Sequence, residues 1–378
     1  MFLDYNFKNY NFRLFFYVLL LNTLGVLVIR SATNQDMAYV SKQIMGIVIG
    51  SVVVIILSLT DYHKILSLSY IIYGVCAALL LSVLLFGVTR NNATRWVILP
   101  GIGQIQPSEF VKIGIIAFFS WFFNKNQEKI NQIRTLITAG VLYLVLFFLI
   151  FRQPDLSTSL VTMVIFLCML FAAGLSYRWI AAAFAVLIPS SILFIYLLQH
   201  NMVPLLKEYQ VRRILAFVNP SEYQEANLQQ DNSIMAIGSG MLQGKGLNNN
   251  TLASVKNGNF LSEEQTDFIF AVIGEELGFI GCALVILVIA LIVYECLIMA
   301  SKAKDMSGRL LCVGVASLLA FQSFSNIAVA TGLFPNTGLP LPFISYGVSS
   351  LMSSYLGIGL VLNAGLQRNV SNHKEGFL

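Results

Sequence analysis

The chain has 378 residues, of which 57% are hydrophobic and 11% are charged, and its formal net charge is +5. Soluble domains contain about 45–50% apolar and about 25% charged residues, so this composition excludes an ordinary soluble protein and favours a polytopic membrane protein. The positive charge does not indicate nucleic acid as a partner, because basic side chains at the cytoplasmic leaflet are attracted to anionic headgroups. Membrane lipids are the partners that the composition predicts.

Ten apolar runs are about as long as, or longer than, the roughly 17–25 residues that a helix needs to cross a bilayer. Because lipid offers backbone groups no hydrogen-bond partner, they predict an all-α polytopic membrane protein with about ten transmembrane helices in one integral membrane domain, residues 1–378. The first run is long for the h-region of a signal peptide and no A-x-A site follows it, so we expect it to be retained. The runs lie at 12–30, 43–60, 66–88, 108–123, 134–151, 156–174, 179–198, 267–300, 309–333 and 343–366.

Basic residues are unevenly distributed between the two sides of this predicted bundle. Twelve lie on the side of the N-terminus: Lys8, Arg13, Lys64, Lys125, Lys129, Arg134, Arg178, Lys302, Lys304, Arg309, Arg368 and Lys374. Five lie in the opposite short loops: Arg30, Lys42, Arg90, Arg95 and Arg152. The positive-inside rule therefore predicts that both termini lie in the cytoplasm.

The positions of the cysteines and histidines do not indicate metal binding or acid–base catalysis inside the predicted spans. The five cysteines fall inside apolar runs without metal-ligand spacing, and we interpret them as small hydrophobic residues. His63, His200 and His373 lie in loops or in the C-terminal tail. Carboxylates, lysines and arginines remain as the candidate reagents.

Residues 199–266 form one long polar loop between the seventh and eighth predicted helices, on the predicted outer face. Within it, LLKEYQVRRILAF (205–217) has apolar residues near helical spacing, which predicts an amphipathic interfacial helix with Arg212 and Arg213 on its wet side. A second short helix is expected at 227–239. In the following GSGMLQGKG, four glycines surround Lys245. That turn would either hold a phosphate in its backbone N–H groups or be a plain flexible turn.

The stretch SEEQTDFIFAVIGEELG (262–278) places five carboxylates at one end of an apolar run. SEEQ has the capping-box pattern, which predicts a helix that begins at Ser262. Asp267 then lies in the second turn, near the outer edge of the membrane, without a structural explanation. Glu275 and Glu276 lie deeper, where Glu275 would line a cavity floor or pair with a neighbouring polar group.

Two further clusters lie at the predicted outer ends of helices. In QPSEFVKI, Gln106-Pro107-Ser108 reads as a helix start, and Glu109 and Lys112 stand on one face, able to form a pair that is either functional or only orients the helix. In FRQPDLSTS, Asp155 follows Pro154 and is either functional or a helix cap.

A fourth cluster, FPNTGLPLPFISYGVSS (334–350), contains three prolines that break the backbone at membrane depth. Irregular backbone is tolerated there only where it is packed in protein or lines a cavity. The four clusters together predict one cavity near the extracytoplasmic side.

These motifs resemble those of the SEDS (shape, elongation, division and sporulation) proteins, which include RodA, FtsW and SpoVE. The matching segments are QPSEFVKI, QPDLSTS, IGSGMLQGKG, TDFIFAVIGEELG and NIAVATGLFPNTGLPLPFISYGVSS, within about 95–350. The resemblance implies a ten-helix bacterial glycosyltransferase that polymerises lipid II at the outer face of the cytoplasmic membrane. It also implies a class B penicillin-binding protein as crosslinking partner. Gln153 and the short termini favour a RodA-like member slightly.

The resemblance assigns roles to individual residues. The essential Asp of the family's T-D-F-I-F motif falls on Asp267, and the Glu and Lys of its Q-P-S-E-F-x-K motif fall on Glu109 and Lys112. Its Arg-Trp pair falls on Arg95 and Trp96.

Three positions depart from the family pattern. Gln265 replaces the common His, Ser157 replaces a Gly, and Val348 replaces the second Gly of S-Y-G-G. These changes leave every candidate acid, base and cation in place.

Glycan polymerisation needs a base for the acceptor hydroxyl and cations for the leaving diphosphate. We expect Asp267 to be the base, with Glu109 and Lys112 in the catalytic set. A divalent cation, Mg²⁺ or Mn²⁺, is compatible with these carboxylates, although no spacing demonstrates one. The candidates for binding the diphosphate or sugar are Arg95, Trp96, Arg212, Arg213, Lys245 and Ser345.

Two other function classes remain open. A lipid-linked sugar transporter would also have broken helices and intramembrane charges, but the polar clusters gather on one side and no internal repeat is visible. A scaffold that only activates its penicillin-binding partner would not need an intact TDFIF motif. The sequence does not separate roles in elongation, division and sporulation.

Overall fold

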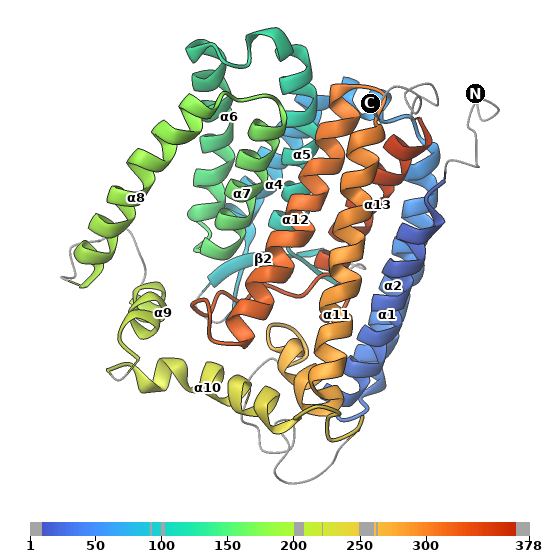
Figure 1. Cartoon of the computed structure of the whole chain (residues 1–378), viewed down its shortest axis with the longest axis vertical. Helices are drawn as coiled ribbons and strands as arrows, with labels where there is room; N and C mark the ends of the chain where they lie inside the picture. Colours follow the sequence, from blue (N-terminus) through green and yellow to red (C-terminus); the bar gives the residue numbers. More distant parts are fainter. Residues whose placement is uncertain are drawn as a thin grey trace, which may run out of the picture.

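The computed structural model describes residues 10–90, 93–99, 103–199, 208–220, 222–248, 261 and 264–367. These residues form a bundle of long helices, with a small sheet and two shorter helices towards one end (Figure 1). The helices are α1 (Phe12–Ala32), α2 (Met37–Leu59), α3 (Tyr62–Ser67), α4 (Ser69–Phe86), α5 (Pro107–Lys125), α6 (Ile133–Phe151), α7 (Leu156–Ala172), α8 (Tyr177–Gln199), α9 (Glu208–Val218), α10 (Gln224–Ser239), α11 (Ile269–Lys302), α12 (Met306–Ala330) and α13 (Val348–Leu366), with a 3₁₀ turn, η2, at Gln127–Lys129.

Seven helices among the described residues are long and apolar enough to cross a membrane: α1, α2, α4, α6, α11, α12 and α13. The apolar α7 is shorter, and α5 and α8 occupy the other two predicted spans. The prediction of a polytopic, helical membrane protein is therefore confirmed. The count of ten transmembrane helices remains a prediction.

The centre of the bundle is formed by α12 and α13, together with α5. In α12 and α13, 67% and 72% of the most apolar window is buried inside the protein, against 22% in α4. Small residues allow this close packing. A β-carbon at Gly50 of α2 would lie 2.2 Å from the ring of Tyr355 in α13, so these two helices can approach this closely only with glycine there.

The two ends of the bundle differ. The start of α1 and the end of α13 lie at one end, whereas α9, α10 and the sheet lie towards the other (Figure 1). The sheet joins α4 to α5 and has the antiparallel order β1 (Val88–Arg90), β2 (Ala93–Leu99), β3 (Gly103–Ile105). This sheet was not predicted from the sequence, although the aromatic and β-branched residues of TRWVIL favour a strand.

Helix α11 begins at Ile269, so the prediction of a capping-box start at Ser262 is wrong. Ser262 itself lies outside the described residues. Residues 264–268 form turns, and no side chain caps the helix at Phe268. The backbone carbonyls of residues 265–267 accept hydrogen bonds from distant segments of the chain, so they do not extend the helix.

A kink interrupts α11 at Gly278, which has φ +65°. The loop after α10 fills the break: the N–H groups of Phe279 and Ile280 donate to the carbonyls of Met241 and Leu242, at 2.9 and 3.2 Å. Asp267 therefore precedes a helix whose first turns are anchored to the α10 loop.

The long loop contains the two short helices that were predicted. The second, α10, spans 224–239 against the predicted 227–239. In α9 the buried residues are Leu215 and Ala216. Phe217, which the helical spacing placed on the apolar face, is 42% exposed, so the buried face differs from the predicted one. The first two leucines of the predicted helix lie outside the described residues.

Candidate active site

Asp267 lies in the turn before α11, against the irregular segment that joins α12 to α13. Its side chain is half-buried, and its backbone carbonyl accepts a hydrogen bond from Asn326 Nδ2 at 2.8 Å. The two preceding carbonyls accept from Ser345 Oγ at 2.6 Å and from the Tyr346 N–H at 2.9 Å. Three hydrogen bonds from α12 and the segment after it therefore position the candidate base.

The 334–347 segment shows both of the settings predicted for irregular backbone at membrane depth: most of it is packed in protein, and Pro335, Asn336 and Thr337 line a cavity. Asn326 Nδ2 also donates to the Leu339 carbonyl at 2.7 Å, and Gln322 Nε2 donates to the Pro340 carbonyl at 3.0 Å. The Ser345 hydroxyl accepts from the Leu341 N–H at 2.8 Å. Two amide side chains of α12 thus replace the hydrogen bonds that a regular helix would supply.

Glu109 and Lys112 form the predicted pair on α5. Lys112 Nζ lies 2.8 Å from each Glu109 carboxylate oxygen and 2.8 Å from Gln322 Oε1. These three acceptors match the three ammonium protons, and Lys112 and Glu109 are only 1% and 3% exposed. The pair thus contacts Gln322, and through it the segment beside Asp267.

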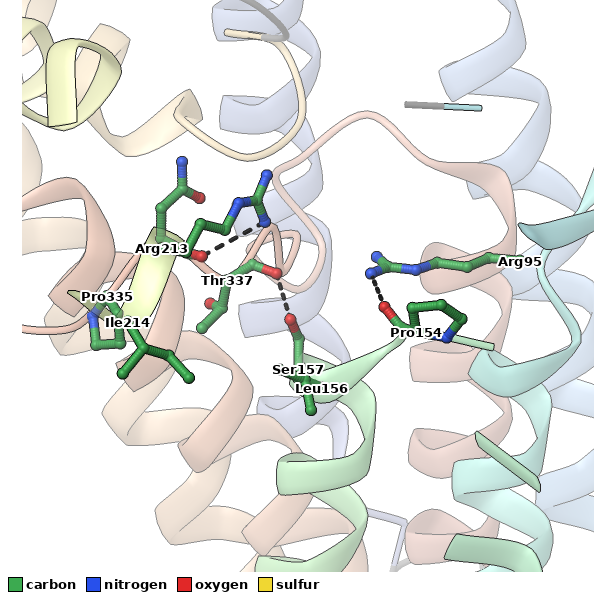
Figure 2. Close-up of a pocket in the computed structure, with 9 residues that line it drawn as sticks. Arg95, Pro154, Leu156, Ser157, Arg213, Ile214, Pro335 and Thr337 are labelled. Carbon is green, nitrogen blue, oxygen red and sulfur yellow. Dashed lines mark hydrogen bonds between the residues drawn. The ribbon is translucent and has the colours of Figure 1, made fainter. Parts of the chain in front are cut away.

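A small cavity near this end of the bundle brings together Arg95 and Arg213 (Figure 2). Its volume is about 60 Å³, which is far below the roughly 300–1,000 Å³ of small-molecule sites. Figure 2 shows the two arginines on either side of a hydrogen bond from Ser157 Oγ to the Thr337 carbonyl. The lining residues are Arg95, Pro154, Leu156, Ser157, Arg213, Ile214, Pro335, Asn336 and Thr337.

Arg95 is anchored to the start of α7. It donates to the Pro154 carbonyl, and its Nη1 lies 3.8 Å from Asp155 Oδ1. Arg95 Nε and Thr337 Oγ1 are buried without a hydrogen-bond partner among the described residues. Such groups cost about 1–3 kcal/mol each when they are unsatisfied.

Asp155 is a helix cap, which was one of its two interpretations. Its carboxylate accepts from the Thr158 N–H at 3.2 Å and the Thr158 hydroxyl at 2.9 Å. It also accepts from Gln106 Nε2 at 3.2 Å, which ties α7 to the start of α5. Asp155 is 1% exposed, so the Arg95 guanidinium lies beside a buried carboxylate.

Arg212, Arg213 and Trp96 occupy different surroundings. Arg212 is exposed, as predicted for the wet side of α9, but Arg213 is half-buried and its Nη1 lies 3.5 Å from the Asn336 carbonyl. The wet-side prediction is therefore wrong for Arg213, because the helix packs against 335–337. Trp96 follows Arg95 in β2 and points to the opposite face of the strand, away from the cavity.

Lys245 is engaged by the protein. Its Nζ lies 2.7 Å from Glu275 Oε1, which settles the two alternatives for Glu275 in favour of a pair. The N–H groups of Lys245 and Gly246 donate to the carbonyls of Glu275 and Glu276, both at 2.9 Å. The turn is therefore tied to α11 by its backbone N–H groups and by the Lys245 ammonium, and phosphate binding there remains a prediction.

Ser345 supports the turn that carries Asp267. It is 5% exposed, and its hydroxyl binds two backbone groups, the Leu341 N–H and the Thr266 carbonyl. Ser345 therefore helps to position the Asp267 turn, and its role in substrate binding remains a prediction.

The carboxylates of the site do not gather into a metal-binding cluster. Within the described ranges, no group of three or more His, Cys, Asp or Glu could hold a metal ion. The divalent cation remains a prediction.

The residues that sequence reasoning missed are Gln322 and Asn326. They stand four apart on α12, inside an apolar run, and therefore share one helical face. Polar side chains at that spacing in a membrane helix indicate a buried hydrogen-bonding stripe. This signal was present in the sequence.

Known proteins match the chain along most of its length. Residues 12–370 match the family model of the FtsW, RodA and SpoVE cell cycle proteins. A Trichlorobacter lovleyi protein named probable peptidoglycan glycosyltransferase FtsW is 34% identical over 376 residues, covering 95% of this chain and 94% of that protein. Escherichia coli peptidoglycan glycosyltransferase MrdB is 33% identical, covering 93% and 92%.

A solved structure is also similar to this chain over most of its length. It comes from a peptidoglycan synthase complex described as coordinating polymerization and crosslinking. It superposes with a TM-score of 0.77 at 28% identity, covering 94% of this chain and 97% of that chain. Relatives named FtsW and MrdB match almost equally, so the slight preference for a RodA-like member stays a prediction. By its helices, its motifs and these similarities, the chain belongs to the FtsW, RodA and SpoVE family of cell cycle proteins, as a multi-pass protein of the cytoplasmic membrane.

Proposed function

We propose that this protein is a peptidoglycan glycosyltransferase that polymerises lipid II into glycan strands at the outer face of the cytoplasmic membrane. Both termini lie in the cytoplasm, and a class B penicillin-binding protein crosslinks the product. The observation that carries the proposal is the Asp267 carboxylate, half-buried on a turn that three long-range hydrogen bonds hold. The names of the relatives and the polymerization and crosslinking ascribed to the solved complex support the same activity.

The reaction forms a bond between the 4-hydroxyl oxygen of an acceptor sugar and the anomeric carbon of a lipid-linked donor. The bond from that carbon to the diphosphate oxygen breaks, and undecaprenyl diphosphate leaves with the electron pair. Asp267 accepts the hydroxyl proton as general base. The negative charge that develops on the diphosphate needs fixed cations and hydrogen-bond donors.

Arg95 and Arg213 supply those donors in the proposed mechanism. They line one cavity, and Arg95 Nε and Thr337 Oγ1 there are buried without partners among the described residues. Guanidinium groups suit phosphate oxygens geometrically. Because the cavity measures only about 60 Å³, it takes the anionic end of the substrate, and the sugars lie outside it.

Glu109 and Lys112 act through Gln322 in this proposal. Their charges compensate each other within α5. Gln322 accepts a hydrogen bond from Lys112 and donates one to the Pro340 carbonyl, so the pair positions that carbonyl through Gln322. We therefore assign the pair to positioning, and Asp267 alone to proton transfer.

The test is polymerisation of lipid II by purified protein in detergent, with an inhibitor of the other class of glycosyltransferase present. Wild-type protein makes glycan chains, and Asp267→Asn reduces the rate by about 10²–10⁴-fold, the usual contribution of a general base. Asp231→Asn, which removes an exposed carboxylate of α10, is the matched control and keeps its activity.

The outcomes separate the base from the two rival function classes. Binding of the penicillin-binding partner and the thermal unfolding of Asp267→Asn should match wild type. Glycan synthesis by Asp267→Asn at the wild-type rate would refute the assignment of the base. A wild-type protein that makes no polymer would favour the transporter or the scaffold, because neither produces glycan in detergent.

A further inference from the structure

We propose that Gly338 is a positioning residue for the reaction, because its bare α-carbon sets where the Asp267 carboxylate lies. A β-carbon built at Gly338 would lie 3.0 Å from Asp267 Oδ2. Ordinary contacts between heavy atoms lie at about 3.5–4.0 Å. The carboxylate therefore rests against a backbone position that presents no side chain to it. The inference builds on the proposed role of Asp267.

The segment on either side of Gly338 is anchored and cannot easily move away. The Thr337 carbonyl accepts from Ser157 Oγ of α7, and the Leu339 carbonyl accepts from Asn326 Nδ2 of α12 at 2.7 Å. Gly338 is thus held between attachments to two different helices. A side chain added there would press against its neighbour rather than shift the segment.

The backbone of Asp267 is anchored as well. Its carbonyl accepts from the same Asn326 amide at 2.8 Å, and the preceding carbonyl accepts from Ser345 Oγ at 2.6 Å. Because both backbones are fixed, the movable part is the carboxylate itself, through rotation of its side-chain torsions. A methyl group at Gly338 should therefore displace Oδ2 by a few tenths of an ångström or turn it away.

A second property of Gly338 must be separated from this contact. Its φ of +70° lies in the left-handed region that favours glycine, so alanine there is strained whatever surrounds it. Gly174 provides the matched control, since its φ is +96° and a β-carbon there would meet nothing within 4 Å. Gly174→Ala introduces a comparable backbone strain without any contact with a carboxylate.

The experiment compares Gly338→Ala with Gly174→Ala in the lipid II polymerisation assay. Small displacements of a catalytic group are costly, about 10²-fold for 1 Å, so a shift of a few tenths of an ångström in Gly338→Ala should lower kcat about three- to sixfold. KM for lipid II should change little, because the diphosphate-binding arginines are untouched. The pH–rate profile of Gly338→Ala should shift relative to wild type, since the surroundings of Asp267 change. Gly174→Ala should keep the wild-type kcat and pH profile.

A second variant covers the case in which Gly338→Ala does not fold. Asparagine tolerates the left-handed region better than alanine does, so Gly338→Asn keeps the added side-chain atoms and reduces the backbone strain. Its kcat should fall as that of Gly338→Ala does, with thermal unfolding closer to wild type.

Three results would contradict these expectations, and they can be told apart. Wild-type kcat in a folded Gly338→Ala or Gly338→Asn would overturn the inference while leaving Asp267 as base. Equal losses of activity in Gly338→Ala and Gly174→Ala would overturn it too, because backbone strain alone would explain both. Wild-type activity in Asp267→Asn would instead overturn the proposed function.

Discussion

The two ends of the helix bundle differ in the kind of backbone that their side chains hold in place. At the end where α13 finishes, charged side chains meet: His63 lies between Asp61 and Asp305, 2.9 Å from each. At the Asp267 end, neutral side chains such as Asn326 hold backbone carbonyls of irregular chain. The first end joins the ends of regular helices. The second fixes chain that has no regular helical hydrogen bonds, and the candidate site lies there.

We therefore expect substitutions at the Asp267 end to lower activity by more than their loss of stability would explain. Substitutions at the opposite end should lower stability alone. The largest stability effect should come from the buried pair on α5. Lys112→Met leaves the Glu109 carboxylate buried without its cation, which costs about 3–5 kcal/mol. It also frees Gln322, so polymerisation should fall at least about tenfold. Thermal unfolding in detergent and the glycan assay measure both.

The double variant Glu109→Gln with Lys112→Met is the control for this prediction. Removing both charges should restore part of the stability, since no uncompensated charge remains. An unchanged Tm in Lys112→Met alone would contradict the prediction that Lys112 compensates a buried Glu109 carboxylate.

The amide of Asn326 offers the sharpest test of the comparison. Asn326→Leu leaves the carbonyls of Asp267 and Leu339 without their donor, at about 1–3 kcal/mol each. Asn363, at the opposite end, is equally buried and donates to the Ser58 carbonyl at 2.8 Å. Both leucine variants should lower the Tm, but only Asn326→Leu should lower kcat. If Asn363→Leu impairs kcat as strongly, the distinction between the two ends fails.

Lys245 and Glu275 should show a smaller effect, because the Lys245 side chain is 26% exposed and water screens the pair. Lys245→Glu places two carboxylates together and should reduce activity a few-fold. Adding Glu275→Lys should restore much of the loss, because the reversed pair can form again. A lysine that bound substrate phosphate would not be rescued in this way, so failure of the double variant would favour the original phosphate interpretation.

The smallest effect should appear in the pH dependence of stability at the opposite end. Burial alone would lower the pKa of His63, but its hydrogen bonds to Asp61 and Asp305 outweigh burial and raise it above 6.5. Burial likewise would raise the pKa of Asp61, and its hydrogen bonds to His63 and Gln367 lower it below 3.8.

The signs of these shifts define a pH window. A raised histidine pKa stabilises the fold below pH 6.5, and this contribution is lost as pH rises through the folded-state pKa. A lowered carboxyl pKa stabilises above pH 3.8, and that contribution is lost as pH falls through the folded-state pKa. His63→Asn should therefore lower the Tm at pH 5 by no more than about 2 °C, and less at pH 8. A larger difference at pH 8 would contradict it.

Local sequence signals were sufficient for several features. Pro107 starts α5, Asp155 caps α7, and Glu109 pairs with Lys112 three residues away. Each depends on neighbours within one helical turn, so spacing alone predicts it. The apolar runs likewise predicted the helices, because a membrane requires every backbone group to be bonded within its own segment.

The capping box at 262 shows where local signals fail. SEEQ matches the pattern, yet the carbonyl of Thr266 is bonded to Ser345, 79 residues away, and that of Asp267 to Asn326, 59 residues away. The pairing of Lys245 with Glu275 and the placement of Arg213 in the cavity also depend on packing between segments. A sequence pattern indicates which kinds of hydrogen bond a residue can form. Which distant residue is its partner depends on the tertiary structure.

The sequence by itself determined that this is a helical membrane protein and that Asp267, Glu109 and Lys112 are its principal candidate residues. The tertiary structure alone decided how deeply each of them is buried and which partners surround it. Lys112 is 1% exposed with three acceptors around it, whereas Asp267 is half-buried beside Gly338. The physical reason is that accessibility depends on how α12 and the 334–347 segment pack, and no local pattern encodes that packing.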